Sequence, residues 1–284
     1  MQLSKPESMT CRGRNFIWGS RTFIMGIINM TPDSFSGDGL MTNARAALDK
    51  AIELEAMGAD IIDIGAESTR PGNSAVSIDE ELERLLPAIE SILLRVNLPI
   101  SIDTYKPEVA RKALEVGASM LNDVWGARTS IEMLELAASS QVPIVLMHNQ
   151  LTPSYVDPVD DVILSLRASV ERALKAGVES KNIIIDPGFG FGKTADHNLE
   201  IMRRLQEFRA LPYPLLIGTS RKSTLGLILD LPVKELLEGT MSTVALSIAN
   251  GADIVRVHDV QETLRVSQVA DAIVRNWRPT HWKK

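Results

Sequence analysis

The chain has 284 residues, of which 45% are hydrophobic and 23% are charged, and its formal net charge is −6. This composition excludes a disordered chain, a collagen-like fibre and a disulfide-framed secreted domain. An acidic chain without a long run of lysine and arginine is also not typical of general nucleic-acid-binding proteins.

The cellular location is indicated by what the sequence lacks. Cys11 is the single cysteine, so no internal disulfide can form and a reducing, cytoplasmic location is expected. No run of 18 apolar residues is present, so no membrane span is expected. The first 25 residues lack the basic start, apolar stretch and small-residue cleavage site of a signal peptide.

Short apolar runs rich in β-branched residues alternate with helical patterns along the chain. Segment 14–23 comes first and is predicted to be a β-hairpin that turns at Gly19-Ser20. Eight strands are then predicted at about 24–29, 61–66, 99–104, 120–125, 143–148, 183–187, 214–219 and 254–258. Helical patterns fill the intervals, and several end at a glycine that precedes the next strand, as at Gly58, Gly117 and Gly251.

One of these helices carries conflicting signals. Ser77 and Glu80 form a capping-box pattern at its start, followed by apolar residues at helical spacing. Pro87 lies inside the pattern and is expected to kink the helix.

Strict alternation of strand and helix predicts parallel pairing. Eight such units in fewer than 300 residues match the size and count of a (β/α)8 TIM barrel, here with a short N-terminal hairpin. An open doubly wound sheet is the alternative. No linker-like stretch is present, so residues 1–284 are expected to form a single domain.

Polar residues follow nearly every predicted strand. Acids and amides, Asp103, Asn122 and Asp186, lie on the third, fourth and sixth strands, where they suit a ligand edge with adjacent N–H donors such as a 2-amino-4-oxo-pyrimidine ring. The cationic candidates are Arg70, Lys222, Arg256 and His258. Because the loops after strands seven and eight are the usual phosphate side of such barrels, the pattern predicts a polar heterocycle next to an anion.

The segment from Gly188 to Thr194 is similar to a phosphate loop, but the similarity fails in detail. A P-loop requires glycine where Pro187 stands, and a dinucleotide fingerprint requires glycine at Lys193. The segment is therefore interpreted as a flexible loop after the sixth strand. The four histidines show no metal-ligand spacing.

Taken together, these strand ends resemble one family, the dihydropteroate synthases of folate biosynthesis. The segments that carry the resemblance, in the family's order, are 25–36 (MGIINMTPDSFS), 63–72 (DIGAESTRPG), 101–104 (SIDT), 122–123 (ND), 186–193 (DPGFGFGK), 220–223 (SRKS) and 256–259 (RVHD). Any one of them is weak, but seven in order across about residues 24–265 are specific. The resemblance implies a (β/α)8 fold, usually as a homodimer.

The resemblance also implies a reaction: 4-aminobenzoate joins the methylene of 6-hydroxymethyl-7,8-dihydropterin diphosphate, giving 7,8-dihydropteroate and diphosphate. Carried over residue by residue, it assigns the pterin to Asp103, Asn122, Asp186 and Lys222, and the diphosphate to Arg256, His258 and Asn29. Asn29 would also help to position Mg²⁺. Thr69, Arg70, Pro71, Phe191 and Ser223 would form the aminobenzoate pocket, where sulfonamide drugs also bind.

The catalytic candidates are Asp103, Lys222 and Asp33, and an Asx turn is the structural alternative for Asp33. No nucleophile–histidine pair is needed, because the amine of 4-aminobenzoate is unprotonated at neutral pH. One departure from the family is Leu151, which stands where a glycine usually lies three residues after the histidine of strand five.

Two other functions are compatible with a pterin-binding barrel. A methyltransferase that moves a methyl group from a folate to a corrinoid protein would share the pterin-holding acids, but it has no use for Lys222, Arg256 and His258 as a diphosphate site. A non-catalytic paralogue that binds pterin or a partner would be expected to lose the polar residues of the first two loops, and these are present.

Overall fold

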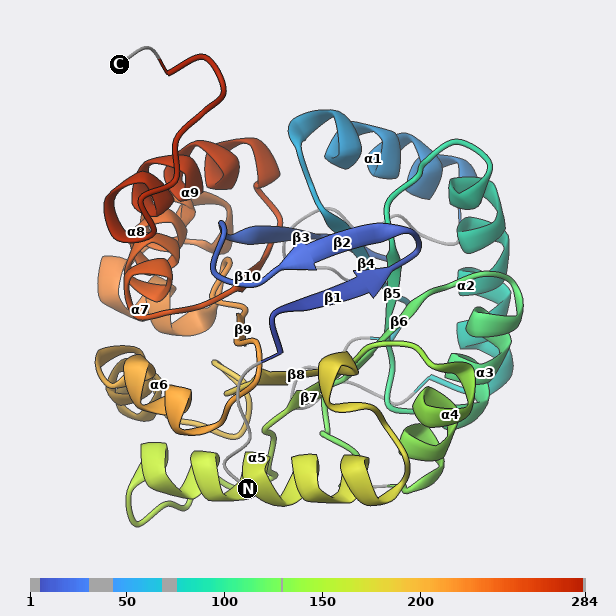
Figure 1. Ribbon diagram of the computed structural model, residues 1–284, viewed down its shortest axis with the longest axis horizontal. Helices are drawn as coiled ribbons and strands as arrows, with labels where there is room; N and C mark the ends of the chain where they lie inside the picture. The colour runs from blue at the N-terminus through green and yellow to red at the C-terminus, as the bar shows by residue number, and fades with distance from the viewer. Residues whose placement is uncertain (1–5, 31–42, 68–75, 129, 283–284) are drawn as a thin grey trace.

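The protein was analysed as a computed structural model that describes residues 6–30, 43–67, 76–128 and 130–282. Eight parallel strands form a central sheet, and helices surround it in a ring (Figure 1). The strands are β3 (Phe23–Asn29), β4 (Ile61–Gly65), β5 (Ile100–Asp103), β6 (Met120–Asp123), β7 (Ile144–Met147), β8 (Ile183–Asp186), β9 (Leu216–Ile217) and β10 (Ile254–Val257). All eight predicted strands are present.

The helices occupy the intervals between the strands. They are α1 (Ala44–Met57), α2 (Ile78–Leu93), α3 (Pro107–Glu115), α4 (Glu132–Ser140), α5 (Pro158–Lys175), α6 (Ala195–Arg203), α7 (Ser223–Leu229), α8 (Leu237–Ala249) and α9 (Val260–Val274). Short 3-10 turns lie at η1 (Ser180–Asn182), η2 (Leu205–Ala210) and η3 (Val233–Glu235). None of the helices described is both long and apolar enough to cross a membrane.

The sheet closes on itself. Its strand order is β8-β7-β6-β5-β4-β3-β10-β9, and all neighbours that carry a register are parallel. A parallel bridge between Ile185 and Leu215 joins the two ends, and the Ile185 amide donates to the Pro214 carbonyl at 3.0 Å. This closure makes a (β/α)8 barrel, and the open doubly wound alternative is excluded.

Glycine ends the helix before β4, as the sequence pattern predicts. Gly58 follows α1 with φ of 97°, in the left-handed region, and its amide donates to carbonyls of the last helical turn. Three residues later the chain enters β4, whose residues are all buried. Buried strands of this kind read as continuous apolar runs because both faces are covered.

The N-terminal hairpin is present, but the prediction of its position was wrong. The paired strands are β1 (Ser8–Cys11) and β2 (Arg14–Ile17), and the turn is at Arg12-Gly13, both with positive φ. Two consecutive residues with positive φ are typical of the type I′ turn that suits hairpin twist. Gly19-Ser20 instead leads from β2 to β3, because Phe23 pairs in parallel with Ile254.

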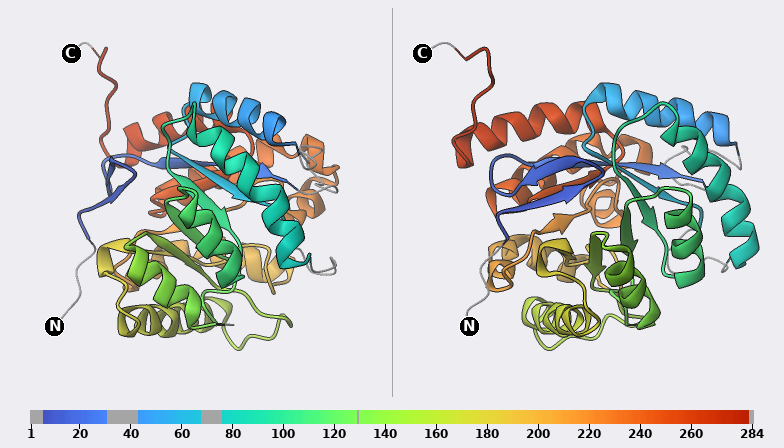
Figure 2. Two further views of the ribbon diagram at one scale, coloured as in Figure 1. Left: turned by 90° about the vertical axis from the view of Figure 1, so that its right-hand side faces the viewer. Right: turned by 45° about the vertical axis from the view of Figure 1, so that its right-hand side comes forward.

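The hairpin covers one end of the barrel (Figures 1 and 2). Met9, Phe16 and Trp18 pack with Met25 and Ile61, which point into the barrel, in one buried apolar cluster. The ring centroids of Phe16 and Phe23 lie 5.0 Å apart in an edge-to-face contact. This packing fills the amino-terminal end of the barrel and leaves the carboxyl end for the site.

Helix α2 begins as predicted and then runs through its proline. The Ser77 hydroxyl accepts from the Glu80 amide at 3.2 Å, which caps the helix. Pro87 is exposed within a continuous helix, and the Ser91 hydroxyl donates to its carbonyl at 2.8 Å. The proline therefore does not interrupt the helix.

Candidate active site

A charged network lies inside the barrel near the carboxyl ends of four strands. The Arg256 guanidinium on β10 donates to Asp63 of β4 at 2.6 Å and to Asp103 of β5 at 2.7 Å. Asn122 of β6 donates its side-chain amide to the same Asp63 oxygen at 3.1 Å. Strands far apart in the sequence thus bring one cation, two carboxylates and an amide into contact.

Two carboxylate oxygens of this network accept no hydrogen bond from the residues described. Oδ1 of Asp63 and Oδ1 of Asp103 are buried and have no hydrogen-bond partner among the residues described. A buried acceptor without a partner is costly, so Oδ1 of Asp103, which also lines a pocket at this end of the barrel, indicates a place for a donor from outside the chain. Burial raises the pKa of Asp103 to about 7, although the charge of Arg256 acts to lower it.

Asp186 ends β8 on the opposite side of the same cup. Its Oδ1 accepts from the Gly188 amide at 2.7 Å, which holds the carboxylate at the turn that follows the strand. Burial raises the pKa of Asp186 to about 6, while the Gly188 amide and the Lys222 ammonium favour the charged form. Asp186 is therefore ionised above about pH 6, and Asp103 above about pH 7.

The wall of the cup is formed by Lys222 and an aromatic ring. The ammonium of Lys222 lies 4.0 Å from the centroid of the Phe191 ring, in cation–π contact. A pocket at this point brings together six of the predicted site residues. It is lined by Asp103, Asn122, Val124, Met147, Asp186, Phe189, Phe191, Gly218, Lys222 and Arg256.

Three further predicted residues lie at the same end of the barrel. Asn29 is the last residue of β3, and Ser223 is the first residue of α7. His258 directly follows β10, where its Nδ1 lies 2.9 Å from the Ser220 hydroxyl. The neighbouring Arg221 forms an ion pair with Asp259 at 2.6 Å, which agrees with a structural role for both.

Four predicted site residues, Asp33, Thr69, Arg70 and Pro71, lie outside the described residues. The chain on either side of the last three is held together, however. The ammonium of Lys106 donates to Glu67 and to the Val76 carbonyl, each at 2.6 Å, and to buried Glu81 at 2.8 Å.

Sequence reasoning missed Asp63 as a member of the site. Its signal was a carboxylate within the apolar run Ile61-Ile62-Asp63-Ile64, on a strand predicted to be buried. The side chain is fully buried, and such a charge requires a partner, which Arg256 supplies. Leu151, the departure from the family pattern, is 88% exposed, so its side chain points away from the barrel.

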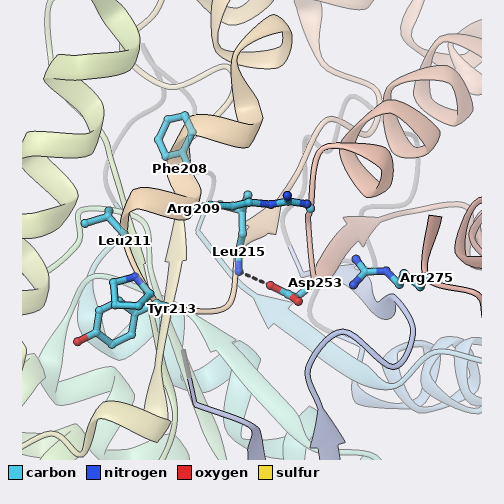
Figure 3. A pocket seen from close by; sticks show the side chains of 9 residues that line it. Phe208, Arg209, Leu211, Tyr213, Leu215, Asp253 and Arg275 are labelled. Carbon is cyan, nitrogen blue, oxygen red and sulfur yellow. Dashed lines mark hydrogen bonds between the residues drawn. The ribbon is translucent and has the colours of Figure 1, made fainter. Parts of the chain in front are cut away.

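A second cavity, of about 420 Å³, lies at the other end of the barrel (Figure 3). It is lined by Phe208, Arg209, Leu211, Pro212, Tyr213, Leu215, Gly251, Asp253 and Arg275. Asp253 accepts from the Leu215 amide at 2.9 Å, and Arg275 pairs with Asp271 at 2.8 Å. These residues precede β9 and β10 or follow α9, on the face that serves stability in such barrels.

The sequence of the chain is similar to those of known pterin-binding enzymes. The family model described as pterin binding enzyme matches residues 25–258. The dihydropteroate synthase of Clostridium beijerinckii is 47% identical over 268 residues, covering 94% of this chain and 100% of the relative. That of Bacillus subtilis is 50% identical over 254 residues, covering 89% of each.

Solved structures of dihydropteroate synthases have the same fold as this chain. The Yersinia pestis dihydropteroate synthase in complex with a sulfonamide drug superposes with a TM-score of 0.89 at 38% identity, covering 93% of this chain and 98% of that one. The Xanthomonas albilineans enzyme in complex with 7,8-dihydropteroate gives 0.85 at 38% identity, covering 94% and 98%. With the fold, the site and these likenesses in agreement, the chain belongs to the pterin-binding enzyme family, among the dihydropteroate synthases.

Proposed function

We propose that the protein condenses 6-hydroxymethyl-7,8-dihydropterin diphosphate with 4-aminobenzoate to give 7,8-dihydropteroate and diphosphate. The observation that carries the proposal is the cup at the carboxyl end of the barrel, where buried acceptors on Asp103 and Asp186 face the cations Arg256 and Lys222. The acceptors of such a cup suit a heterocycle that is rich in donors, and its cations suit an anion.

The pterin is proposed to bind at the floor. Its 2-amino group and ring N–H are donors, and the carboxylates of Asp103 and Asp186 are acceptors. The side-chain amide of Asn122 and the ammonium of Lys222 supply donors to a ring nitrogen and to the 4-oxo group of the pterin. Arg256, held between Asp63 and Asp103, has a fixed plane on which the flat ring can stack.

The diphosphate is proposed to lie toward Arg256, His258 and Asn29, at the ends of β10 and β3. Mg²⁺ fits this position in donor chemistry, because the Asn29 side-chain oxygen is a hard ligand and the diphosphate supplies others. Among the residues described, no group of three or more His, Cys, Asp or Glu side chains could hold a metal by itself. When bound, Mg²⁺ neutralises the leaving diphosphate.

The reaction is a displacement at the pterin methylene carbon. The bond from this carbon to the diphosphate oxygen breaks with its electron pair on the oxygen, and the aromatic amine nitrogen bonds to the carbon and then releases a proton. Asp103, beside the pterin, stabilises the positive charge that develops on the methylene and ring. Phe191 and Ser223, with Thr69, Arg70 and Pro71, are proposed to hold the aminobenzoate, and sulfonamides are proposed to compete there.

A folate-dependent methyltransferase is the competing function, and a binding measurement separates the two. Calorimetry with dihydropterin diphosphate and Mg²⁺ is expected to show saturable binding that weakens when the diphosphate is removed from the ligand. Tight binding of methyltetrahydrofolate, with no effect of the diphosphate, would contradict the proposal. Catalysis in the cytoplasm is proposed as well, and it is compatible with the single cysteine, Cys11, which is buried.

A homodimer is proposed through α6 to α9. Helices α7, α8 and α9 pack side by side (Figure 1), and with α6 they present exposed apolar side chains. These are Leu199, Leu227, Ile228, Leu246, Val269 and Ile273. Clustered apolar side chains on one face of a protein are typical of an interface between copies.

Sedimentation equilibrium tests this interface. The wild-type chain is expected to sediment at twice its 31.2 kDa, and Leu246→Glu at the mass of one chain, because a buried charge without a partner disfavours association. Leu164→Glu, at a similarly exposed position on α5, is the matched control and should stay dimeric. A monomeric wild type, or a dimeric Leu246→Glu, would refute the proposed face.

Affinity for the pterin is expected to fall as the pH falls. The pKa of Asp186 is raised to about 6 and that of Asp103 to about 7, and each loses an acceptor on protonation. A pterin without diphosphate should bind at least about tenfold more weakly at pH 5 than at pH 8, as measured by calorimetry. Both pKa values lie above that of Asp in the unfolded chain. The two groups therefore contribute stability to the fold at low pH, and this contribution is lost as the pH rises from about 4 to 7. Equal affinity at both pH values would show that these carboxylates do not bind the pterin.

A further inference from the structure

Lys193 ends the glycine-rich segment after β8, and its side chain turns back toward that segment. The ammonium donates to the Gly188 carbonyl at 2.9 Å and to the Phe191 carbonyl at 3.0 Å. It also lies 2.9 Å from Nδ1 of His148, which follows β7. The lysine that makes this segment similar to a phosphate loop is thus occupied by protein acceptors.

These three contacts hold the Lys193 ammonium in one place, and together they are called the Lys193 clamp. Burial lowers the pKa of Lys193 to about 7, with the charge of Asp186 acting to raise it. The pKa of His148 is lowered to about 3 by burial and by the charges of Lys193 and Arg128, so its ring is neutral and Nδ1 accepts. An ammonium bound to two carbonyls and an imidazole nitrogen uses all three of its donors.

The clamp acts on a segment that lies directly against the site. The Phe191 amide donates to the Gly188 carbonyl at 3.1 Å, so Lys193 binds both ends of this turn. A side chain at Gly190 would come within 3.0 Å of the Lys222 chain, and the Phe191 ring lies under the Lys222 ammonium. The turn therefore has little freedom, and the place of the Phe191 ring depends on it.

We propose that Lys193 is a positioning residue, which fixes the turn 188–191 so that the Phe191 ring is preformed as a wall for the aromatic amine substrate. The proposal rests on the proposed function. Its consequence is selective. Affinity for 4-aminobenzoate depends on the clamp, whereas the pterin is also bound by Asp103 and Asn122, on β5 and β6, which form no hydrogen bond with Lys193.

Steady-state kinetics of Lys193→Met test this selectivity. At pH 6.5, between the pKa values of Asp186 and Lys193, KM for 4-aminobenzoate is expected to rise about tenfold, with kcat and the KM for dihydropterin diphosphate within about twofold of wild type. Lys181→Met, at an exposed lysine before β8, is the matched control and should be unchanged. Unchanged KM for 4-aminobenzoate in Lys193→Met, or an equal loss for both substrates, would overturn the proposal.

A second measurement does not depend on activity. Hydrogen exchange of the peptide that spans 187–193 is expected to be at least about tenfold faster in Lys193→Met than in wild type, with the strands unaffected. Lys193→Gln, which keeps two N–H donors on a shorter side chain, should fall between the two and serves where Lys193→Met folds poorly. Unchanged exchange would refute the clamp. If wild type forms no dihydropteroate while exchange responds as expected, the proposed function fails and the clamp stands.

Discussion

Lys222→Ala is expected to lower kcat/KM by about 10³-fold while leaving the fold intact. Lys222 lines the cup together with Asp103 and Arg256, and its charge acts on Asp186 as well as on the Phe191 ring. Removing the ammonium takes away a donor to the pterin and a cation near the reacting centre. Release of diphosphate, followed under saturating 4-aminobenzoate, measures the effect.

The control for this variant is Lys175→Ala, at an exposed lysine near the end of α5. Its rate should equal that of wild type, and both variants should keep the wild-type melting temperature within about 2 °C, because neither removes buried apolar surface. Near-normal turnover by Lys222→Ala would show that the site has been placed in the wrong part of the molecule.

The second large effect is expected for Asp63→Asn, on a residue that would not touch the substrate. Asp63 binds Arg256 at 2.6 Å and Asn122 at 3.1 Å, so it sets the place of two groups assigned to the pterin and the diphosphate. Loss of its charge leaves Arg256 paired with Asp103 alone. The expected result is a loss of about 2–3 kcal/mol in the free energy of unfolding and about 10²-fold in kcat/KM.

A matched control lies just before the same strand. Asp60 lies just before β4 and pairs with Arg21 at 2.6 Å, at the opposite end of the barrel from the cup. Asp60→Asn should lose some stability in urea denaturation, because this pair is partly buried, but keep kcat/KM within about twofold. If the two variants lost activity to the same extent, the network around Arg256 would have no special part in the reaction.

The fold was largely predictable from the sequence, because its signals are local. Each strand is a short apolar run, and residues such as Gly58 mark the helix ends by a conformation that other residues rarely adopt. The hairpin was misplaced, since Ser8–Cys11 carries little β-branched or aromatic signal and the turn at Arg12-Gly13 was not recognised. Tertiary packing of Phe16 against Phe23 decides that region.

The candidate site was predictable where polar side chains end strands, as for Asp103, Asn122 and Asp186. Asp63 and Lys193 could not be assigned in this way, because their roles depend on partners, Arg256 and His148, that are distant in sequence. A periodic pattern shows which face of a strand is buried, but it does not show which buried charges meet. Closure of the barrel supplies that information.

If this cup joins an aromatic amine to a pterin methylene as diphosphate leaves, the purified protein should make both products. Incubation with dihydropterin diphosphate, Mg²⁺ and 4-aminobenzoate, followed by mass and phosphate analysis, measures them. We expect 7,8-dihydropteroate and diphosphate in equal amounts, each absent when 4-aminobenzoate is omitted. Diphosphate release without dihydropteroate, or no turnover by protein that binds the pterin, would contradict this expectation.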